Sequence, residues 1–232
     1  MPLSRRFGAL LLTGTILLAC NATDGAKREQ PGAVAARDTT HAAGAARVDS
    51  ALLARADSGR IQGSPSAPVW IIEISDFQCP YCRVWHEETY QQVKREYIDT
   101  GKARFAYLNL PLPSHRNAWP AAEAAMCAAA QGKFWPMHDA LFTTQQRWGS
   151  LPDPLPLFDS LATSAGVDGA KLRQCIASRA VRPLIQADAD RAVEAKVNST
   201  PTFIIGNARI EGAYPFAEFK RAVDAALARA GR

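Results

Sequence analysis

The stretch VWIIEISDFQCPYC, residues 69–82, decides the fold that the sequence predicts. Its first part, residues 69–74, is an apolar, β-branched run bounded by a proline and an aspartate, which indicates a buried strand. Residues 82–97 follow with packing side chains repeated every four positions, which is typical of a helix. The two cysteines Cys79 and Cys82 therefore lie where a buried strand gives way to a helix.

This position suits a reactive thiol. The free N–H groups and the positive end of the dipole at a helix start favour a thiolate over a thiol. Pro80 fits there because its missing N–H would be unpaired in any case. We expect Cys79, at the exposed tip, to be the nucleophile with a lowered pKa, and Cys82, nearly one turn inside, to resolve the mixed disulfide. Such exchange uses the cysteine pair itself, so we expect no other cofactor.

A zinc site is the alternative for a Cys-x-x-Cys motif. Zinc usually takes four ligands, often from a second cysteine pair or from paired histidines. The other cysteines beyond the leader, Cys127 and Cys175, stand alone in predicted helices, and His86 has no obvious fourth partner. We therefore expect redox chemistry and no bound metal.

The rest of the chain completes an α/β pattern. Residues 103–110 read as a second strand, and residues 117–197 form a long helical region rich in Ala, Leu and Gln. Residues 202–212 read as a strand pair with a Gly-Asn turn, followed by an amphipathic helix over 216–227. With 47% apolar and 21% charged residues the chain is of globular composition, and its body has no Lys/Arg-rich block that would favour nucleic-acid binding.

Several of these motifs together resemble the DsbA-like branch of the thioredoxin superfamily. They are DFQCPYC at 76–82, Thr-Pro-Thr-Phe at 200–203, and the helical motifs AAEAA at 121–125 and GKFW at 132–135. The likeness covers residues 61–227. It implies a thioredoxin-like α/β fold, with a helical insertion between the βαβ part and the C-terminal ββα part, and activity as a thiol:disulfide oxidoreductase.

The resemblance also implies a substrate-binding surface beside the cysteines. In this family the proline matching Pro201 is cis and lies next to the redox pair, and the residue matching Thr200 presents its backbone to the partner chain. From the residues alone, Thr200-Pro201 is an ordinary loop before a strand, so the cis assignment rests on the resemblance. Pro80 and Tyr81, between the cysteines, are expected to contact the same partner.

Glu73 interrupts the apolar strand six residues before Cys79, where the thioredoxin family often has a buried acid. A buried carboxyl has a raised pKa and can relay a proton to or from Cys82, which makes Glu73 a third candidate catalytic residue. The alternative is an acid at a strand end that reaches solvent.

The first 20 residues predict export. Two adjacent arginines precede a short apolar core, as in a secretory signal, and the sequence LLAC resembles a lipobox in which Cys20 receives a lipid. Ordinary cleavage after Ala22 would leave no anchor. Residues 21–47 have almost no large apolar side chain and read as a flexible tether, which leaves 48–232 as the folded domain. We expect the periplasmic side of a bacterial cell envelope, with a lipid anchor in a membrane.

Export also bears on the remaining cysteines. In an oxidising compartment a leftover pair usually bonds, so we expect a structural disulfide between Cys127 and Cys175. Closing a loop of about 50 residues would stabilise the insertion by about 4 kcal/mol. Two buried, unpaired thiols are the alternative.

The expected function is disulfide exchange with exported proteins that contain cysteines, most simply as an oxidase that a quinone-linked membrane protein reoxidises. Pro80-Tyr81 in place of the Pro-His pair of strong oxidants, and Thr200 before the proline, keep a reductase or isomerase with a membrane electron donor open. A chaperone-like module that holds unfolded chains is the alternative from another class. Residues 21–47 are too short and polar for a dimerisation domain, so we expect a monomer.

Overall fold

The computed structural model describes residues 49–231. The predicted secretory signal with its lipobox at 1–20, the lipid site Cys20 and the tether at 21–47 lie outside the described residues. Within residues 49–231 the helices are too short or too polar to span a bilayer.

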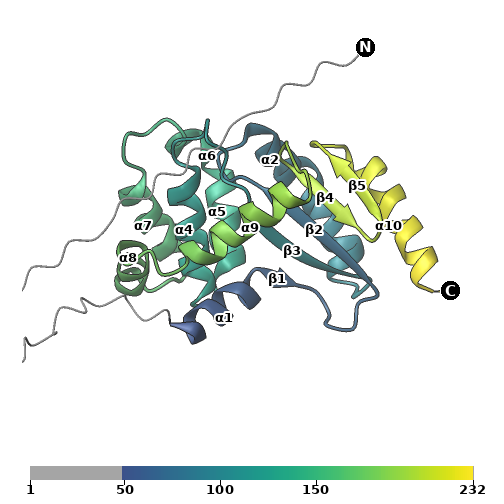
Figure 1. Ribbon diagram of the computed structural model, residues 1–232, viewed down its shortest axis with the longest axis horizontal. Helices are drawn as coiled ribbons and strands as arrows, with labels where there is room; N and C mark the ends of the chain where they lie inside the picture. Colours follow the sequence, from purple (N-terminus) through teal and green to yellow (C-terminus); the bar gives the residue numbers. More distant parts are fainter. Residues whose placement is uncertain (1–48, 232) are drawn as a thin grey trace, which may run out of the picture. The chain divides into compact units, whose positions relative to one another are not determined.

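The described part of the chain forms a mixed sheet of five strands (Figure 1). β2 and β3 are parallel at its centre, and β1, β4 and β5 each run antiparallel to a neighbour. The predicted central strands and C-terminal hairpin are confirmed, whereas the two residues of β1 are too few for a periodic pattern. The order is β1-β3-β2-β4-β5, with β1 (Ile61–Gln62), β2 (Val69–Ser75), β3 (Ala103–Asn109), β4 (Thr202–Ile205) and β5 (Ala208–Glu211).

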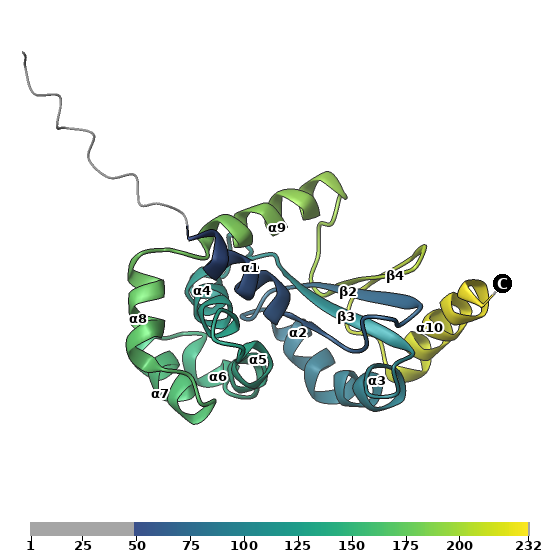
Figure 2. The same ribbon diagram turned by 90° about the horizontal axis from the view of Figure 1, so that it is seen from below.

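Helices cover both faces of the sheet (Figure 2). One face carries the helical segment after the cysteines and α10 (Phe216–Ala230), and its core includes Trp85, Phe105, Phe203 and Phe219. The opposite face carries α9 (Arg182–Glu194), where Ala192 packs near Ile74. The segment after the cysteines consists of α2 (Pro80–Trp85), a π-helical stretch η1 (His86–Tyr90), α3 (Gln91–Val93) and a second π-helical stretch η2 (Lys94–Ile98).

The predicted helical insertion is present between β3 and β4. Its helices α4 to α8 gather to one side of the sheet (Figures 1 and 2), and α1 (Ser50–Gly59) packs on α4. Ten of the twelve residues of α4 are buried, and most are alanines, which allow neighbouring helices to approach closely. The helices are α4 (Ala118–Ala129), α5 (Phe134–Thr143), α6 (Gln145–Trp148), α7 (Leu155–Ser164), α8 (Gly169–Ala177) and α9.

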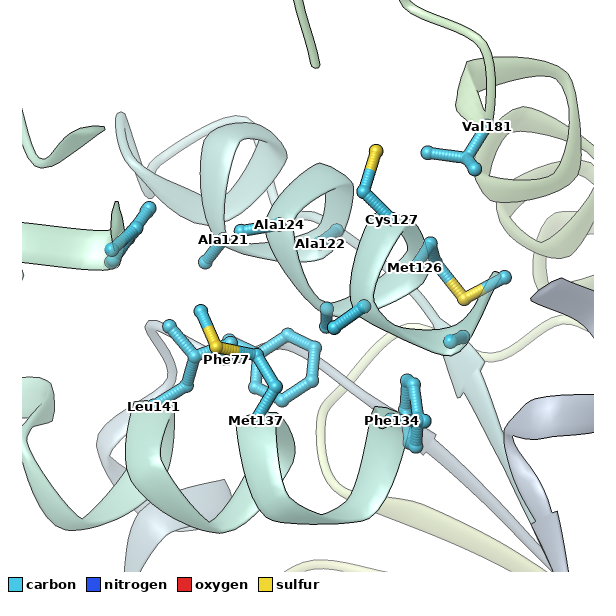
Figure 3. Packing of buried hydrophobic residues seen from close by; sticks show 14 of the residues in the cluster. Phe77, Ala121, Ala122, Ala124, Met126, Cys127, Phe134, Met137, Leu141 and Val181 are labelled. Carbon is cyan, nitrogen blue, oxygen red and sulfur yellow. The ribbon is translucent and has the colours of Figure 1, made fainter. Parts of the chain in front are cut away.

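The core of the insertion reaches the cysteine motif. Phe77 lies between the alanine face of α4 and the α5 side chains Met137 and Leu141 (Figure 3). Its ring also stacks on Tyr107 of β3 with 4.8 Å between the ring centroids. The segment before Cys79 is thus packed against both the sheet and the insertion.

Two long-range links hold the insertion in place. A disulfide between Cys127 on α4 and Cys175 on α8 closes a loop of 48 residues, so these two thiols are bonded in the structure. The carboxylate of Asp188 on α9 is fully buried and accepts hydrogen bonds from Arg60 and from Asn109 at the end of β3. A buried ion pair needs such additional bonds, because removing either partner leaves an uncompensated charge.

Candidate active site around Cys79 and Cys82

The two cysteines lie at the start of the helix that follows β2. Cys79 is the N-cap residue of α2 with an extended backbone, Pro80 is the first helical residue, and Cys82 lies in the first turn. Both thiols are unbonded in this structure. The local sequence thus produces the strand-to-helix junction that favours a thiolate at the helix end.

Cys79 is less accessible than expected from an exposed tip. It is only 4% exposed, because the loop before β4 lies against it: the Cys79 Sγ is 3.4 Å from the carbonyl oxygen of Thr200. The peptide bond between Thr200 and Pro201 is cis. Between the cysteines, Tyr81 is 66% exposed and Pro80 is also exposed, so both face solvent beside the buried sulfur.

The two thiols differ strongly in acidity. The pKa of Cys79 is lowered to about 6, mainly by a hydrogen bond with the Cys82 thiol; the Thr200 side chain and nearby backbone N–H groups add to this, and burial opposes it. Burial raises the pKa of Cys82 well above its ordinary value, and the neighbouring Cys79 adds to the rise. Near neutral pH the arrangement therefore provides one reactive thiolate and one buried thiol beside it.

Glu73 lies in the middle of β2 and is 1% exposed, so it is not an acid at a strand end that reaches solvent. Burial raises its pKa to about 8, and the nearby Ser75 hydroxyl opposes the rise. No polar atom among the described residues completes a hydrogen bond with either carboxyl oxygen. Its charge also contributes to the raised pKa of Cys82.

The buried carboxyl of Glu73 gives a prediction about stability and pH. The pKa of Glu73 is about 8 in the folded protein, whereas an unperturbed glutamate, as in the unfolded chain, has a pKa of 4.5. The folded chain therefore holds this proton more tightly. The group therefore lowers the free energy of unfolding progressively as the pH rises from about 4.5 to about 8. The difference in free energy of unfolding between Glu73→Gln and the parent is therefore expected to shift in favour of the variant by about 3 kcal/mol between pH 4 and pH 7.

Urea unfolding of both proteins at the two pH values measures this gain, and comparing them cancels the titration of other groups. Glu88→Gln, at an exposed position on η1, is the matched control and should show no such gain. An equal pH dependence of Glu73→Gln and the parent would contradict a buried, protonated carboxyl.

Amide side chains that the sequence analysis did not single out fix the cysteine loop to the insertion. Gln145 Nε2 donates to the carbonyl oxygens of Phe77 and Cys79, at 2.7 and 2.8 Å. Gln78 Oε1 accepts from the backbone N–H of Asn117 at 2.7 Å. The Asn117 side chain donates to three carbonyl groups at the end of α6 and just after it, those of Trp148, Gly149 and Leu151. Because these residues are far apart in sequence and of an ordinary type, no local pattern reveals them.

Within residues 49–231, His86, His138 and Asp139 form a group whose ligand atoms lie within 4.8 Å of one another. Asp139 Oδ1 accepts from His86 Nε2 at 3.0 Å and from His138 Nδ1 at 2.8 Å. A histidine that binds a metal normally donates its other ring N–H to an acceptor. The other ring nitrogens here are buried with no partner in the described part of the chain, so this group fits a hydrogen-bonded link between η1 and α5 better than a metal site.

Residues 55–225 match the family model described as thioredoxin. The chain belongs to the thioredoxin family. Solved structures with the same fold include BdbD from Bacillus subtilis in its oxidised form, with a TM-score of 0.68, 23% identity, and 74% of this chain and 94% of that chain covered. Another is α-DsbA1 from Wolbachia pipientis, with a TM-score of 0.67, 24% identity, and 74% and 92% covered.

Similar sequences include two kinds of protein. The probable disulfide bond formation protein D of Bacillus anthracis is 29% identical over 172 residues, which cover 71% of this chain and 76% of that protein. The Na(+)/H(+) antiporter NhaA 3 of Salinispora tropica is 35% identical over 177 residues, 75% of this chain. The matched region spans about a quarter of the antiporter, 26% of its length. Together with the fold, these similarities agree with the DsbA-like resemblance that the sequence motifs indicated.

Proposed function

We propose that this thioredoxin-family protein is an oxidase that introduces disulfides into exported proteins. The observation that carries the proposal is the lowered pKa of Cys79, which is about 6. A stabilised thiolate favours the reduced form of the pair, so the Cys79–Cys82 disulfide is easily reduced by a client. A client with two thiols then leaves with a disulfide, and the enzyme keeps the two electrons as a dithiol.

The exchange takes place in two steps through a mixed disulfide with Cys79. A client thiolate attacks Cys79 Sγ, the Cys79–Cys82 bond breaks, and Cys82 leaves as a thiolate that takes up a proton. A second client thiolate attacks the client sulfur of the mixed disulfide and releases Cys79 as a thiolate. Thr200 and Pro201, beside Cys79, and the exposed Pro80 and Tyr81 form the surface on which the client chain lies.

The same proposal includes the setting of the reaction. The protein acts on the periplasmic side of a bacterial cell envelope as a monomer, held to a membrane by lipid on Cys20. A quinone-linked membrane protein removes the two electrons and restores the disulfide. The alternatives are a reductase or isomerase that a membrane donor keeps reduced, and a chaperone-like module without turnover.

The reduction potential of the Cys79–Cys82 pair tests the direction of electron flow. Full-length protein is equilibrated in glutathione buffers, and the fraction of disulfide is measured by alkylation and mass spectrometry. We expect a potential above about −150 mV, near that of DsbA. A value near about −270 mV, as in thioredoxin, would support a reductase or isomerase instead.

Stoichiometric oxidation of a client completes the test. The oxidised protein is mixed with a reduced peptide that contains two cysteines, and one peptide disulfide is expected for each enzyme disulfide lost. A Cys79→Ala/Cys82→Ala variant is the control and should form none. Binding of the peptide without loss of the enzyme disulfide would favour the chaperone-like module.

A further inference from the structure

Unpartnered polar atoms gather on one patch of the sheet beside the cysteines. The parallel register of β2 and β3 pairs Glu73 with Tyr107 and Ser75 with Asn109. All four side chains are buried, and Tyr107 is 0% exposed. The carboxyl oxygens of Glu73 and the hydroxyls of Ser75 and Tyr107 have no hydrogen-bond partner within the described residues. Buried polar groups are nearly always paired, so a concentration of unpaired ones next to a titratable group calls for an explanation.

We infer that Tyr107 and Ser75 are positioning residues that donate hydrogen bonds to Glu73 when it is ionised, and so set how readily it exchanges a proton with Cys82. Paired residues of neighbouring parallel strands point to the same face of a sheet, which brings the Tyr107 ring to the side of Glu73. Ser75 follows two residues later on the same strand and so points to the same face as Glu73.

The electrostatics of the three groups agree with this geometry. The Ser75 hydroxyl lowers the pKa of Glu73 and also that of Tyr107, as a donor beside both groups would. Burial raises the pKa of Tyr107 well above its ordinary value, and the charges of Glu73 and Cys82 add to the rise. The phenol therefore keeps its proton at neutral pH and is a donor that brings no charge of its own.

Three side chains on neighbouring elements of the described chain are poorer candidates for this donor. Phe203 of β4 pairs with Glu73 in register and has no polar side-chain atom. Tyr90 of η1 already has its hydroxyl bonded to a glutamine, and its pKa is raised by burial. His138 of α5, which packs against the tyrosine of β3, shares its Nδ1 proton with an aspartate, and burial lowers its pKa to about 4. Cys82 is the group that exchanges the proton.

The inference rests on the proposed exchange reaction and adds a step to it. When Cys82 leaves the disulfide as a thiolate, the Glu73 carboxylic acid transfers its proton to the sulfur and becomes a carboxylate. The side chains of Ser75 and Tyr107 then shift to donate their O–H groups to the new charge. When Cys82 attacks in the reverse direction, the carboxylate takes the proton back. One proton moves and no further oxidant or reductant is needed.

The first experiment measures the protonation of Glu73 itself and does not depend on the proposed function. Protein labelled with ¹³C at the glutamate carboxyl is titrated by NMR, and the Glu73 signal is the one missing from Glu73→Gln. The pH midpoint of Glu73 ionisation is expected to rise by about one unit in Tyr107→Phe and in Ser75→Ala, because each variant lacks a donor to the carboxylate. One unit is a tenfold change in the ratio of ionised to protonated Glu73. An unchanged midpoint in both variants would overturn the inference.

Tyr97→Phe is the matched control, since Tyr97 is another buried tyrosine and its hydroxyl donates to Asp224 at 2.7 Å. Its midpoint should equal that of the parent. Tyr107→Phe keeps the ring that stacks on Phe77, so the fold is expected to persist, and near-ultraviolet circular dichroism checks this. A shift of equal size in Tyr97→Phe would assign the effect to general loosening of the core and refute the specific role.

The second experiment follows the release of glutathione from its mixed disulfide with Cys79 between pH 5 and pH 9. In Tyr107→Phe the pH midpoint of this rate should move upward together with the NMR midpoint. If the NMR midpoint moves and no exchange occurs in any variant, the proposed function fails while the hydrogen-bond role stands. If exchange occurs and neither midpoint moves, the function stands and the inference fails.

Discussion

Cys82→Ala is expected to turn the protein into a trap for mixed disulfides. Cys79 keeps its position at the N-cap of α2 and still attacks, but the thiol that resolves the intermediate is gone. An intramolecular thiol acts at a very high effective concentration, so release should slow by at least about 10³-fold. The variant is mixed with oxidised glutathione, and the adduct on Cys79 is followed by mass spectrometry without reduction.

Cys79→Ala is the informative counterpart, because it leaves the other thiol of the pair. Cys82 is 0% exposed and burial raises its pKa, so it should form almost no adduct under the same conditions. Rapid glutathionylation of Cys79→Ala would assign the attacking role to Cys82 and reverse the roles proposed above.

Replacing the disulfide of the insertion is expected to give the largest loss of stability. Cys127→Ala/Cys175→Ala opens a closed loop of 48 residues, which should lower the free energy of unfolding by about 4 kcal/mol through the greater entropy of the unfolded chain. Urea unfolding of the oxidised proteins measures the difference.

The control for this loss is Cys79→Ala/Cys82→Ala. It also removes two buried cysteines, but the disulfide between them closes only a short loop. This variant should unfold within about 2 kcal/mol of the parent, because so short a loop constrains the unfolded chain less. Equal stability of the Cys127→Ala/Cys175→Ala variant and the parent would show that the insertion is held by its alanine-rich packing alone.

The elements that the sequence predicted well are those with a local cause. The β-branched run at 69–74 produced β2, and the Gly-Asn turn produced the hairpin of β4 and β5. The order of elements then required the helices between β3 and β4 to form an insertion. The strand β1 was not predicted, because two residues carry no periodicity and it exists through its pairing with β3.

The site follows the same rule. Cys79 and Cys82 are recognisable because their reactivity depends on a strand-to-helix junction that is local in sequence. The burial of Cys79 was not foreseen, since the residues that cover it, Thr200 and Gln145, come from other parts of the chain. The hydroxyl of Tyr107 was missed for a related reason, because an aromatic residue in a strand reads as core until the register with Glu73 is known.

The strand pairing also sets an order of events during synthesis. β2 is completed early in the chain, yet one of its two neighbours is β4, which follows more than a hundred residues later. Contacts of such sequence separation form late, because the entropy of closing the intervening loop must first be overcome. In a chain that leaves the ribosome or crosses a membrane from its N-terminus, both thiols therefore emerge before the β4 segment that packs beside them. Cys79 meets Thr200, and so gains its final acidity, only when nearly the whole domain has emerged.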